Sequence, residues 1–341
     1  MSVQKIFLNT AFALAILAIT ATLPTGYGAV FAANVTIKAH TNQPASETSY
    51  QYVYLTQFAE RVHRGTQGRV STKIFPGGQL GKDTAVLQQV QLGAVEMGIF
   101  AFPHTSKLFR PFNAFLLPFL FGDHAAGTFA LEGPTAQKLY ADFEKATGIK
   151  VLGAFNGGFR GITNSVKPIT SVTDFAGMKI RVPGSPVLIA TLQKLGINPI
   201  SMSTGEIFTA LQQKTIDGQE SGVAWGFGKG FAEVQKYLTE TRHAVSGTVM
   251  VINTKFLNSL SAADQKAVAQ AARDATLYIN GFTRMYDRSV IDKYKAAGIK
   301  VTTLDNKKLR PLVKEVWDKY AEEVGGIEII KSIIKDGEHK Y

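Results

Sequence analysis

The feature that most constrains the fold is a regular alternation of strand-like and helix-like segments, which begins at Val35. The strand patterns cover 35–40, 69–75 and 95–100, and the helical patterns between them cover 49–62 and 83–92. Parallel strands need a long crossover, usually a helix, so this alternation indicates a parallel sheet with helices packed on its faces. Ligands of such sheets bind beyond the carboxyl ends of the strands. We therefore expect an α/β protein.

The same alternation starts again at Ile149, which implies a second sheet. Its strand patterns cover 149–155, 161–165, 179–183 and 198–202, with helical patterns at 187–195 and 205–214. Ser203 and Glu206 form the signature of a capping box at the start of the last helix. The aromatic segment 112–123 is interpreted as buried packing. A chain of 341 residues with two such patterns is expected to form two domains.

Residues 261–297 predict an unusually long helix. The stretch lacks proline, starts with Ser261 as N-cap, ends before Gly298, and repeats apolar residues at helical spacing. A continuous helix of about 37 residues is roughly 55 Å long, because each residue adds 1.5 Å. That length exceeds the diameter of one small domain. Either Gly281 breaks the helix, or the helix spans both domains and couples them mechanically.

Residues 1–32 have the layout of a secretory signal peptide. Lys5 precedes an apolar run at 6–23, and Val30 and Ala32 occupy the small or aliphatic positions before a cleavage site. An uncleaved membrane anchor is the alternative, because the run approaches spanning length. The chain has no cysteine, which excludes disulfides and a lipid anchor on cysteine. We expect a monomeric mature protein that starts near Ala33 and diffuses freely in the periplasm.

The sequence contains no G-x-S-x-G elbow, no H-E-x-x-H pair and no phosphate-binding loop. The glycine-rich stretch 222–231 has Gly230 rather than a hydroxyl residue after Gly228-Lys229. The six histidines are scattered without the spacing of a metal site. The net charge of +11 is spread along the chain instead of forming the basic stripe of a nucleic-acid interface. We therefore predict no catalytic residues, no metal, no cofactor and no nucleic-acid partner.

Two arginines beside glycines are the main candidates for ligand binding. Along the strand pattern 179–183, Ile180 and Val182 share one face and Arg181 lies on the other. Arg160 stands at the edge of another strand pattern, beside glycines that allow a ligand to approach the backbone. A guanidinium group stays charged and holds a carboxylate through two parallel N–H bonds. A solvated arginine on a strand rim is the alternative for Arg181.

Several longer stretches resemble a known transport family. These are FPGGQLGKDTAVLQQVQLGAVEMG at 75–98, GGFRGITNS at 157–165, the stretch 177–222, and FAEVQKYLTETRH at 231–243. RVP, ALQ, DGQE and EVQKYL occur in that order. Together these stretches resemble the substrate-binding proteins of tripartite ATP-independent periplasmic (TRAP) transporters, of the dicarboxylate-binding type. The match runs from about Val35 nearly to the end of the chain.

The resemblance implies a two-lobed α/β fold of the periplasmic binding protein type, with a hinge, a long helix across both lobes and closure over an organic acid. We expect lobe I to comprise 33–157 plus 247–286, and lobe II to comprise 158–246 plus 287–341. The implied function is capture of a carboxylate for the membrane subunits of a TRAP transporter, without catalysis. The alternatives are an exported ligand-sensing domain and an enzyme that acts on a carboxylic acid with Glu220 as base.

The resemblance also assigns roles to single residues. Arg181, in the RVP strand, is expected to make the bidentate carboxylate contact, and Arg160 a second anion or polar contact. Ser221 replaces the asparagine of the family pattern D-G-Q-E-N-P, which puts that amide contact in doubt. His40 falls at a family ligand position, with a structural role as the alternative.

Three aromatic residues bear on the choice of ligand. Phe100 and Phe102 are expected at the pocket rim, and Trp225 lies just after Ser221. They indicate a more apolar pocket, suited to a monocarboxylate rather than a highly hydroxylated sugar acid, and a core position is the alternative for each. The predicted substrate-binding residues are Arg181, Arg160, Ser221, Trp225, Phe100, Phe102, His40 and Glu220.

Overall fold

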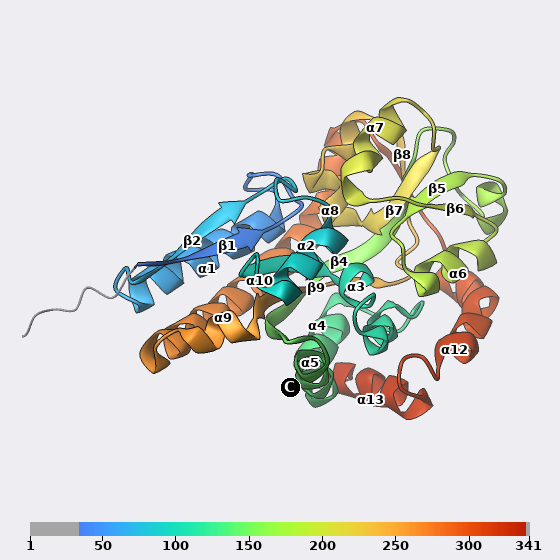
Figure 1. Cartoon of the computed structure of the whole chain (residues 1–341). Helices are drawn as coiled ribbons and strands as arrows, with labels where there is room; N and C mark the ends of the chain where they lie inside the picture. Colours follow the sequence, from blue (N-terminus) through green and yellow to red (C-terminus); the bar gives the residue numbers. More distant parts are fainter. Residues whose placement is uncertain (1–33, 339–341) are drawn as a thin grey trace, which may run out of the picture. The chain divides into compact units, whose positions relative to one another are not determined.

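A ten-stranded mixed sheet is the central feature of the fold (Figure 1). The computed structural model describes residues 34–338, so the predicted signal peptide lies outside the described residues. The strands follow the order β2-β1-β3-β9-β4-β7-β5-β6, with β8 beside β4 and β10 beside β8. Their bounds are Val35–His40 (β1), Val70–Phe75 (β2), Met97–Ala101 (β3), Ile149–Asn164 (β4), Lys179–Val182 (β5), Asn198–Ser201 (β6), Gly218–Gly222 (β7), Tyr237–Glu240 (β8), Val245–Asn253 (β9) and Lys300–Thr303 (β10).

The parallel arrangement predicted from the alternating segments is confirmed. β1 pairs in parallel with β2 and β3, and the connecting helices are α1 (Tyr50–Gly65) and α2 (Asp83–Leu92). β5 pairs in parallel with β6 and β7, and α6 (Pro186–Lys194) connects β5 to β6. The α/β fold class therefore follows from the crossover helices.

The two sheets that the sequence predicts share one strand, which joins them into a single mixed sheet. The patterns at 149–155 and 161–165 form the single strand β4. Its first part pairs with β9, and its last part pairs with β7 and β8. The glycines between the two patterns form a β-bulge between Asn156 and Phe159, where Gly158 has a φ of +90°. A bulge bends a strand without ending it, and glycine adopts the left-handed conformation that this one needs.

The sheet consists of two halves that share β4. We call β1, β2, β3, β9 and the first part of β4 the first half, and β5, β6, β7, β8, β10 and the last part of β4 the second half. The exact lobe boundaries stay predictions.

The last helix, α13 (Ile327–Gly337), packs against α4 (His124–Glu132) and α5 (Pro134–Thr147). There the backbone N–H of Thr135 donates to Asp336 at 2.9 Å.

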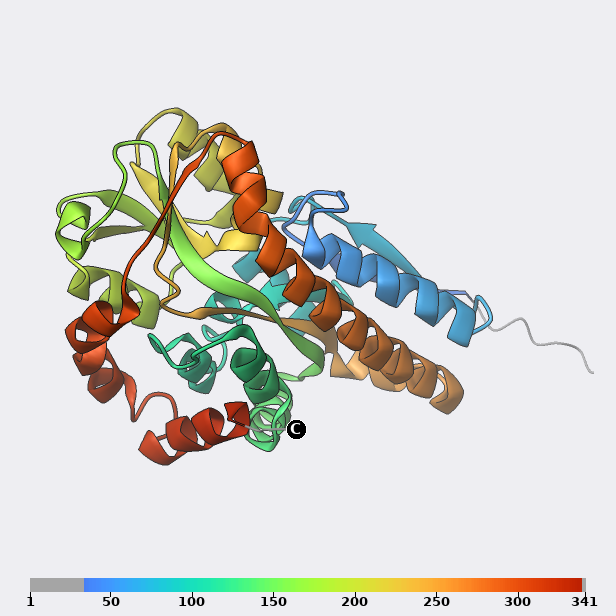
Figure 2. The ribbon, with the colours of Figure 1, turned by 180° about the vertical axis from the view of Figure 1, so that it is seen from behind.

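The long helix predicted at 261–297 is confirmed as α10 (Ala262–Ala296), which continues through Gly281. The hydroxyl of Ser261 caps it by accepting from the backbone N–H of Asp264 at 3.1 Å. The helix packs against α1, β4, β10 and α8 (Val223–Gly228). Figure 2 shows it crossing from the strands of one half to those of the other. α10 thus spans both lobes of a two-lobed fold.

The segment 112–123 is buried up to Phe121, as predicted, whereas Gly122 and Asp123 are exposed. Its first part lies in the 3-10 helix η1 (Arg110–Leu116), where Phe112 and Phe115 are fully buried. The other helical elements are α3 (Phe102–Thr105), α7 (Ile207–Gln212), α9 (Thr254–Ser259), α11 (Asn306–Leu309) and α12 (Lys314–Tyr320), with 3-10 turns η2 (Val172–Phe175), η3 (Thr204–Glu206), η4 (Phe231–Glu233) and η5 (Arg310–Val313).

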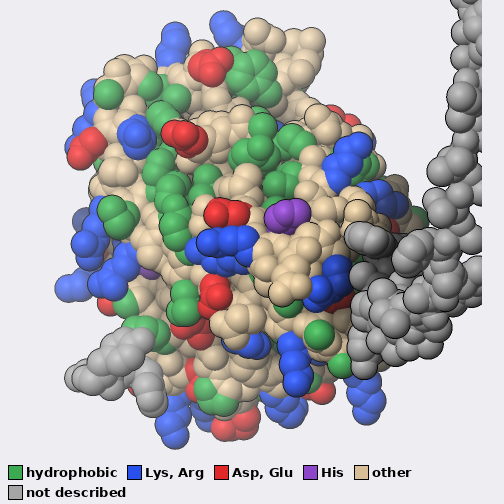
Figure 3. All heavy atoms as spheres, turned by 90° about the vertical axis from the view of Figure 1, so that its left-hand side faces the viewer, with side chains coloured by type: hydrophobic (Ala, Val, Ile, Leu, Met, Phe, Trp, Pro, Cys, Tyr) green, Lys and Arg blue, Asp and Glu red, His purple; other side chains and the backbone are tan. Residues whose placement is uncertain are grey.

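The surface carries charges of both signs. On the face shown in Figure 3, Lys and Arg side chains are scattered among Asp and Glu side chains. Over residues 34–338, none of the helices combines the length and the hydropathy needed to cross a bilayer.

Candidate ligand-binding site

Arg181 provides a buried positive charge at the site. Ile180 and Val182 face the core from β5, so Arg181 projects from the opposite face of the strand. The residue is 3% exposed, and its Nε donates to the backbone oxygen of Met202 at 3.0 Å. No carboxylate in the described part of the chain lies within ion-pair distance of its guanidinium group. Burial lowers the pKa of Arg181 to about 9, although Glu220 acts in the opposite direction. A buried cation without a counter-ion is costly, so this group is suited to bind an anion.

Arg160 is also buried, but it is neutralised inside the protein. It comes from β4, and its partner Glu220 comes from the neighbouring strand β7. Arg160 donates from Nε and Nη2 to the two carboxylate oxygens of Glu220, and the Nη2 contact measures 2.8 Å. His243 Nε2 lies 3.1 Å from Glu220, and His243 Nδ1 lies 2.7 Å from the hydroxyl of Thr241. Burial alone would raise the pKa of Glu220, but Arg160 and His243 lower it to about 2. The pair is therefore an ionised, bidentate contact.

Both arginines line one cavity of about 30 Å³. Of the predicted residues, Arg181, Arg160, Ser221 and Trp225 contribute to its lining, whereas Glu220 lies behind Arg160. The lining also includes polar residues that were not predicted, among them Tyr50, Gln51, His104, Ser246 and Thr248. No local motif marks these residues, because strand register and the packing of α1 and α3 decide where they point.

His40, Phe100 and Phe102 lie outside the lining of this cavity. The rings of His40 and Phe100 stack with centroids 5.4 Å apart, and Phe102 stacks on Phe115 at 4.8 Å. All four side chains are fully buried. The interpretation of a more apolar pocket therefore depends on Trp225 alone among the three aromatic residues.

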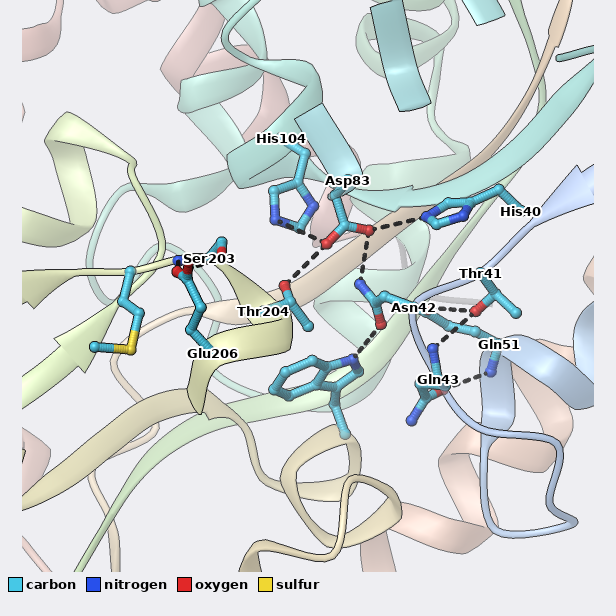
Figure 4. A network of polar contacts seen from close by, with 12 residues as sticks. His40, Thr41, Asn42, Gln43, Gln51, Asp83, His104, Ser203, Thr204 and Glu206 are labelled. Carbon is cyan, nitrogen blue, oxygen red and sulfur yellow. Dashed lines mark hydrogen bonds and ion pairs between the residues drawn. The ribbon is translucent and has the colours of Figure 1, made fainter. Parts of the chain in front are cut away.

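A network of polar side chains surrounds Asp83, the first residue of α2 (Figure 4). Its buried carboxylate accepts hydrogen bonds from Asn42 Nδ2 and Thr204 Oγ1, both at 2.9 Å. The Nε2 atoms of His40 and His104 lie 3.3 and 3.7 Å from the same carboxylate. Burial would raise the pKa of Asp83, but the two histidines and the hydrogen bonds hold it well below its usual range. Thr204 follows β6 in the second half, so its bond to Asp83 runs between the halves.

Two further contacts connect the same regions. Lys82 Nζ donates to Glu206 Oε1 at 2.8 Å, and the indole N–H of Trp225 donates to Asn42 Oδ1 at 3.2 Å. Glu206 Oε2 accepts from the backbone N–H of Ser203, which confirms the predicted capping box. We call three of these bonds the cross-cleft contacts, and they are Asp83–Thr204, Lys82–Glu206 and Asn42–Trp225.

A second cavity has a volume of about 260 Å³. Arg181 and His104 line both cavities, and the second one also contains Lys107, Lys82 and Glu206. Within residues 34–338, no group of three or more histidine, cysteine or acidic side chains is placed to hold a metal ion. The chemistry that this arrangement supports is recognition of an anion by a free guanidinium group and polar neighbours.

Comparison with known proteins relates these features to one family. Residues 40–323 match the model of the bacterial extracellular solute-binding proteins, family 7. The chain is 33% identical over 291 residues to the 2,3-diketo-L-gulonate-binding periplasmic protein of Escherichia coli K12, which covers 84% of this chain and 88% of that protein. It is 30% identical over 274 residues to the C4-dicarboxylate-binding periplasmic protein of Rhodobacter capsulatus, with coverages of 79% and 82%.

Solved structures agree with the sequence comparison. The sugar acid-binding protein of Advenella mimigardefordensis, in complex with galactonate, superimposes with a TM-score of 0.85 at 28% identity, over 89% of this chain and 98% of that one. A TRAP periplasmic solute-binding protein from Polaromonas, bound to D-erythronate, gives a TM-score of 0.84 at 30% identity, with coverages of 88% and 98%. The chain therefore belongs to family 7 of the bacterial extracellular solute-binding proteins, the solute-binding proteins of TRAP transporters.

Proposed function

We propose that the protein is a periplasmic solute-binding protein that captures an organic acid and delivers it to the membrane subunits of a TRAP transporter. The observation that carries the proposal is Arg181, a buried guanidinium group in the wall of a cavity, with no ion-pair partner among residues 34–338. A carboxylate bound there would accept two parallel N–H bonds and supply the missing negative charge. The ligands named for the similar proteins, diketogulonate, galactonate and erythronate, are acids, which supports the same assignment.

Binding requires the cleft to open. The cavity of about 30 Å³ is far below the ~300–1,000 Å³ of typical ligand pockets. Two of the cross-cleft contacts include residues that line this cavity, namely Thr204, Asn42 and Trp225, and all three contacts connect the two halves. We propose that the acid binds Arg181 in an open form and then shifts the population of hinge states toward the closed form.

A thermal-shift screen of organic acids and mass spectrometry of any co-purified acid first identify the best ligand. Calorimetry with that acid and purified protein then tests the proposal. Arg181→Ala should weaken binding of the best acid by more than tenfold, because loss of one partner of a buried charge pair costs about 2–5 kcal/mol. Arg64→Ala is the control, since Arg64 is exposed on α1 and pairs with Glu60. Unchanged affinity of Arg181→Ala would remove Arg181 from the site.

We do not propose an enzyme. A general base is most effective when its pKa lies near the working pH. The pKa of Glu220 is about 2, and both of its carboxylate oxygens accept from Arg160. Prolonged incubation with the bound acid, followed by mass spectrometry, should return the acid unchanged, and appearance of a product would favour the enzyme.

A transport role differs from ligand sensing in its effect on uptake. Cells that lack the protein should lose uptake of the acid, and purified protein added to the periplasmic side should restore it. Uptake that continues at the normal rate would favour a sensing role.

We also propose that the protein acts as a monomer, which light scattering with and without the acid would check.

A further inference from the structure

We infer that the site selects organic acids with a single negative charge, and that Glu220 sets this selectivity by neutralising Arg160. The inference depends on the proposed function, because it assumes that one carboxylate of the ligand binds Arg181. It concerns the net charge that a ligand meets in the cavity, which the family match does not determine.

The first step is the charge of the cavity wall. Arg160 and Arg181 contribute the positive charges, and no acidic side chain of the described residues lines the cavity. Glu220 is fully buried behind Arg160 and accepts from both Nε and Nη2 of its guanidinium group. The remaining nitrogen of Arg160, Nη1, has no hydrogen-bond partner among residues 34–338. Arg160 can therefore donate a hydrogen bond to a neutral ligand oxygen but adds almost no net charge.

The second step is the surroundings of Arg181. The carboxylate of Asp83 faces this region from α2, although it lies beyond ion-pair distance of the guanidinium group. Its four neighbours are Asn42, Thr204, His40 and His104, so it adds a negative charge near the cavity without pairing with Arg181. Arg181 therefore provides the one uncompensated positive charge that a ligand meets among the described residues of this cavity, and one carboxylate neutralises it.

The third step is the cost of a second carboxylate. Inside the same cavity it would meet no free cation among the described residues, because Glu220 neutralises Arg160, and Asp83 would repel it. An ionised group that leaves water without a partner pays a large desolvation cost. The nearest alternative is the second cavity, where Lys82 pairs with Glu206 and the carboxylate of Asp83 opposes the charge of Lys107. We expect a dianion to bind at least ~10-fold more weakly than a monoanion of the same shape, since each factor of ten corresponds to 1.4 kcal/mol.

Matched acids test the inference on the unaltered protein. Calorimetry compares succinamate with succinate, galactonate with galactarate, and D-erythronate with tartrate. In every pair that binds, the acid with one carboxylate should be tighter by about tenfold or more. Equal or tighter binding of the dianion would overturn the inference while leaving the proposed function intact. Failure of all these acids and of the wider screen to bind would overturn the proposed function and the inference together.

Two variants test the role of Glu220. Glu220→Gln preserves the size of the side chain and frees the charge of Arg160, so the ratio of dianion to monoanion affinity should rise by about tenfold. The double variant Arg160→Gln/Glu220→Gln removes both charges and keeps the net charge of the cavity, so it should keep the wild-type ratio. Thermal denaturation establishes that each variant is folded. A folded Glu220→Gln protein with the wild-type ratio would overturn the assignment to Glu220. If that variant does not fold, the comparison of matched acids on the wild-type protein still tests whether the site prefers a single negative charge.

Discussion

Arg160 and Arg181 are the same type of residue with different partners, and this difference predicts different consequences of mutation. Arg160 is held by Glu220, whereas Arg181 is held by a backbone carbonyl. Glu220→Gln leaves the buried Arg160 unpaired, which should lower the free energy of unfolding by about 3–5 kcal/mol. The same change at Glu328, which is exposed and pairs with Lys331, should cost less than ~1 kcal/mol. Urea denaturation at neutral pH measures both, and equal losses would contradict the prediction.

Glu220 also makes stability depend on pH. Its pKa falls from an ordinary value of 4.5 to about 2 in the folded protein. Its contribution to stability is therefore fully present above a pH of about 4.5 and is lost as the pH falls toward 2. The lowered pKa of Asp83 acts in the same direction. The difference in the free energy of unfolding between wild type and Glu220→Gln should shrink as the pH falls from about 5 to 3. Urea denaturation across that range measures it, and a constant difference would contradict the prediction.

Single residues differ in how much of their role the sequence reveals. The alternation of β5 predicts that Arg181 faces away from Ile180 and Val182, and the structure confirms this because those two side chains are in the core. The pairing of Arg160 with Glu220 is not visible in the sequence, since the residues are 60 positions apart and meet only through the β4–β7 register.

At the scale of elements, β4 and α10 pack against each other and contain glycines with opposite expected effects. Gly158 in β4 has a φ of +90°, and a Cβ atom there would lie 2.1 Å from Oδ1 of Asp287. Gly158→Ala should therefore destabilise the protein by more than ~1 kcal/mol. A Cβ atom at Gly281 in α10 meets nothing within 4 Å, and Gly281→Ala should stabilise the protein by roughly 0.5–1 kcal/mol, since alanine favours helix. Urea denaturation measures both changes, and the same sign for both would contradict the prediction.

The same two elements show what an elementary pattern can and cannot predict. α10 was predictable at full length because its helical spacing continues past Gly281 without proline. β4 was not predictable as one strand, because Gly157 and Gly158 read as a loop and only the pairing with β9 keeps the strand continuous. The two halves join into one sheet because β4 pairs with β9 in its first part and with β7 and β8 in its last part.

At the scale of the whole molecule, the cross-cleft contacts should influence closure. Thr204→Val preserves shape but removes the hydrogen bond to the buried carboxylate of Asp83, which costs about 1–3 kcal/mol. If the open form lacks this bond, the population shifts toward it and the affinity for the acid falls by about 5- to 150-fold. Small-angle scattering of the ligand-free variant should give a larger radius of gyration than that of the wild type.

Thr209→Val is the matched control for this change. Thr209 lies on α7, and its side chain makes none of the cross-cleft contacts. Its affinity and radius of gyration should equal those of the wild type. If Thr204→Val behaved in the same way as this control, the bond to Asp83 would have no part in closure.

The capping box at Ser203 has a consequence for repeated cycles of transport. One oxygen of Glu206 stays bound to the start of η3, while the other accepts from Lys82. In the open form that we propose, the lysine contact would be broken, but the bond to the start of η3 would hold the carboxylate in its rotamer. Each time the two halves close again, only the side chain of Lys82 has to lose rotational freedom. The entropy lost on closure is therefore smaller than it would be for two free side chains.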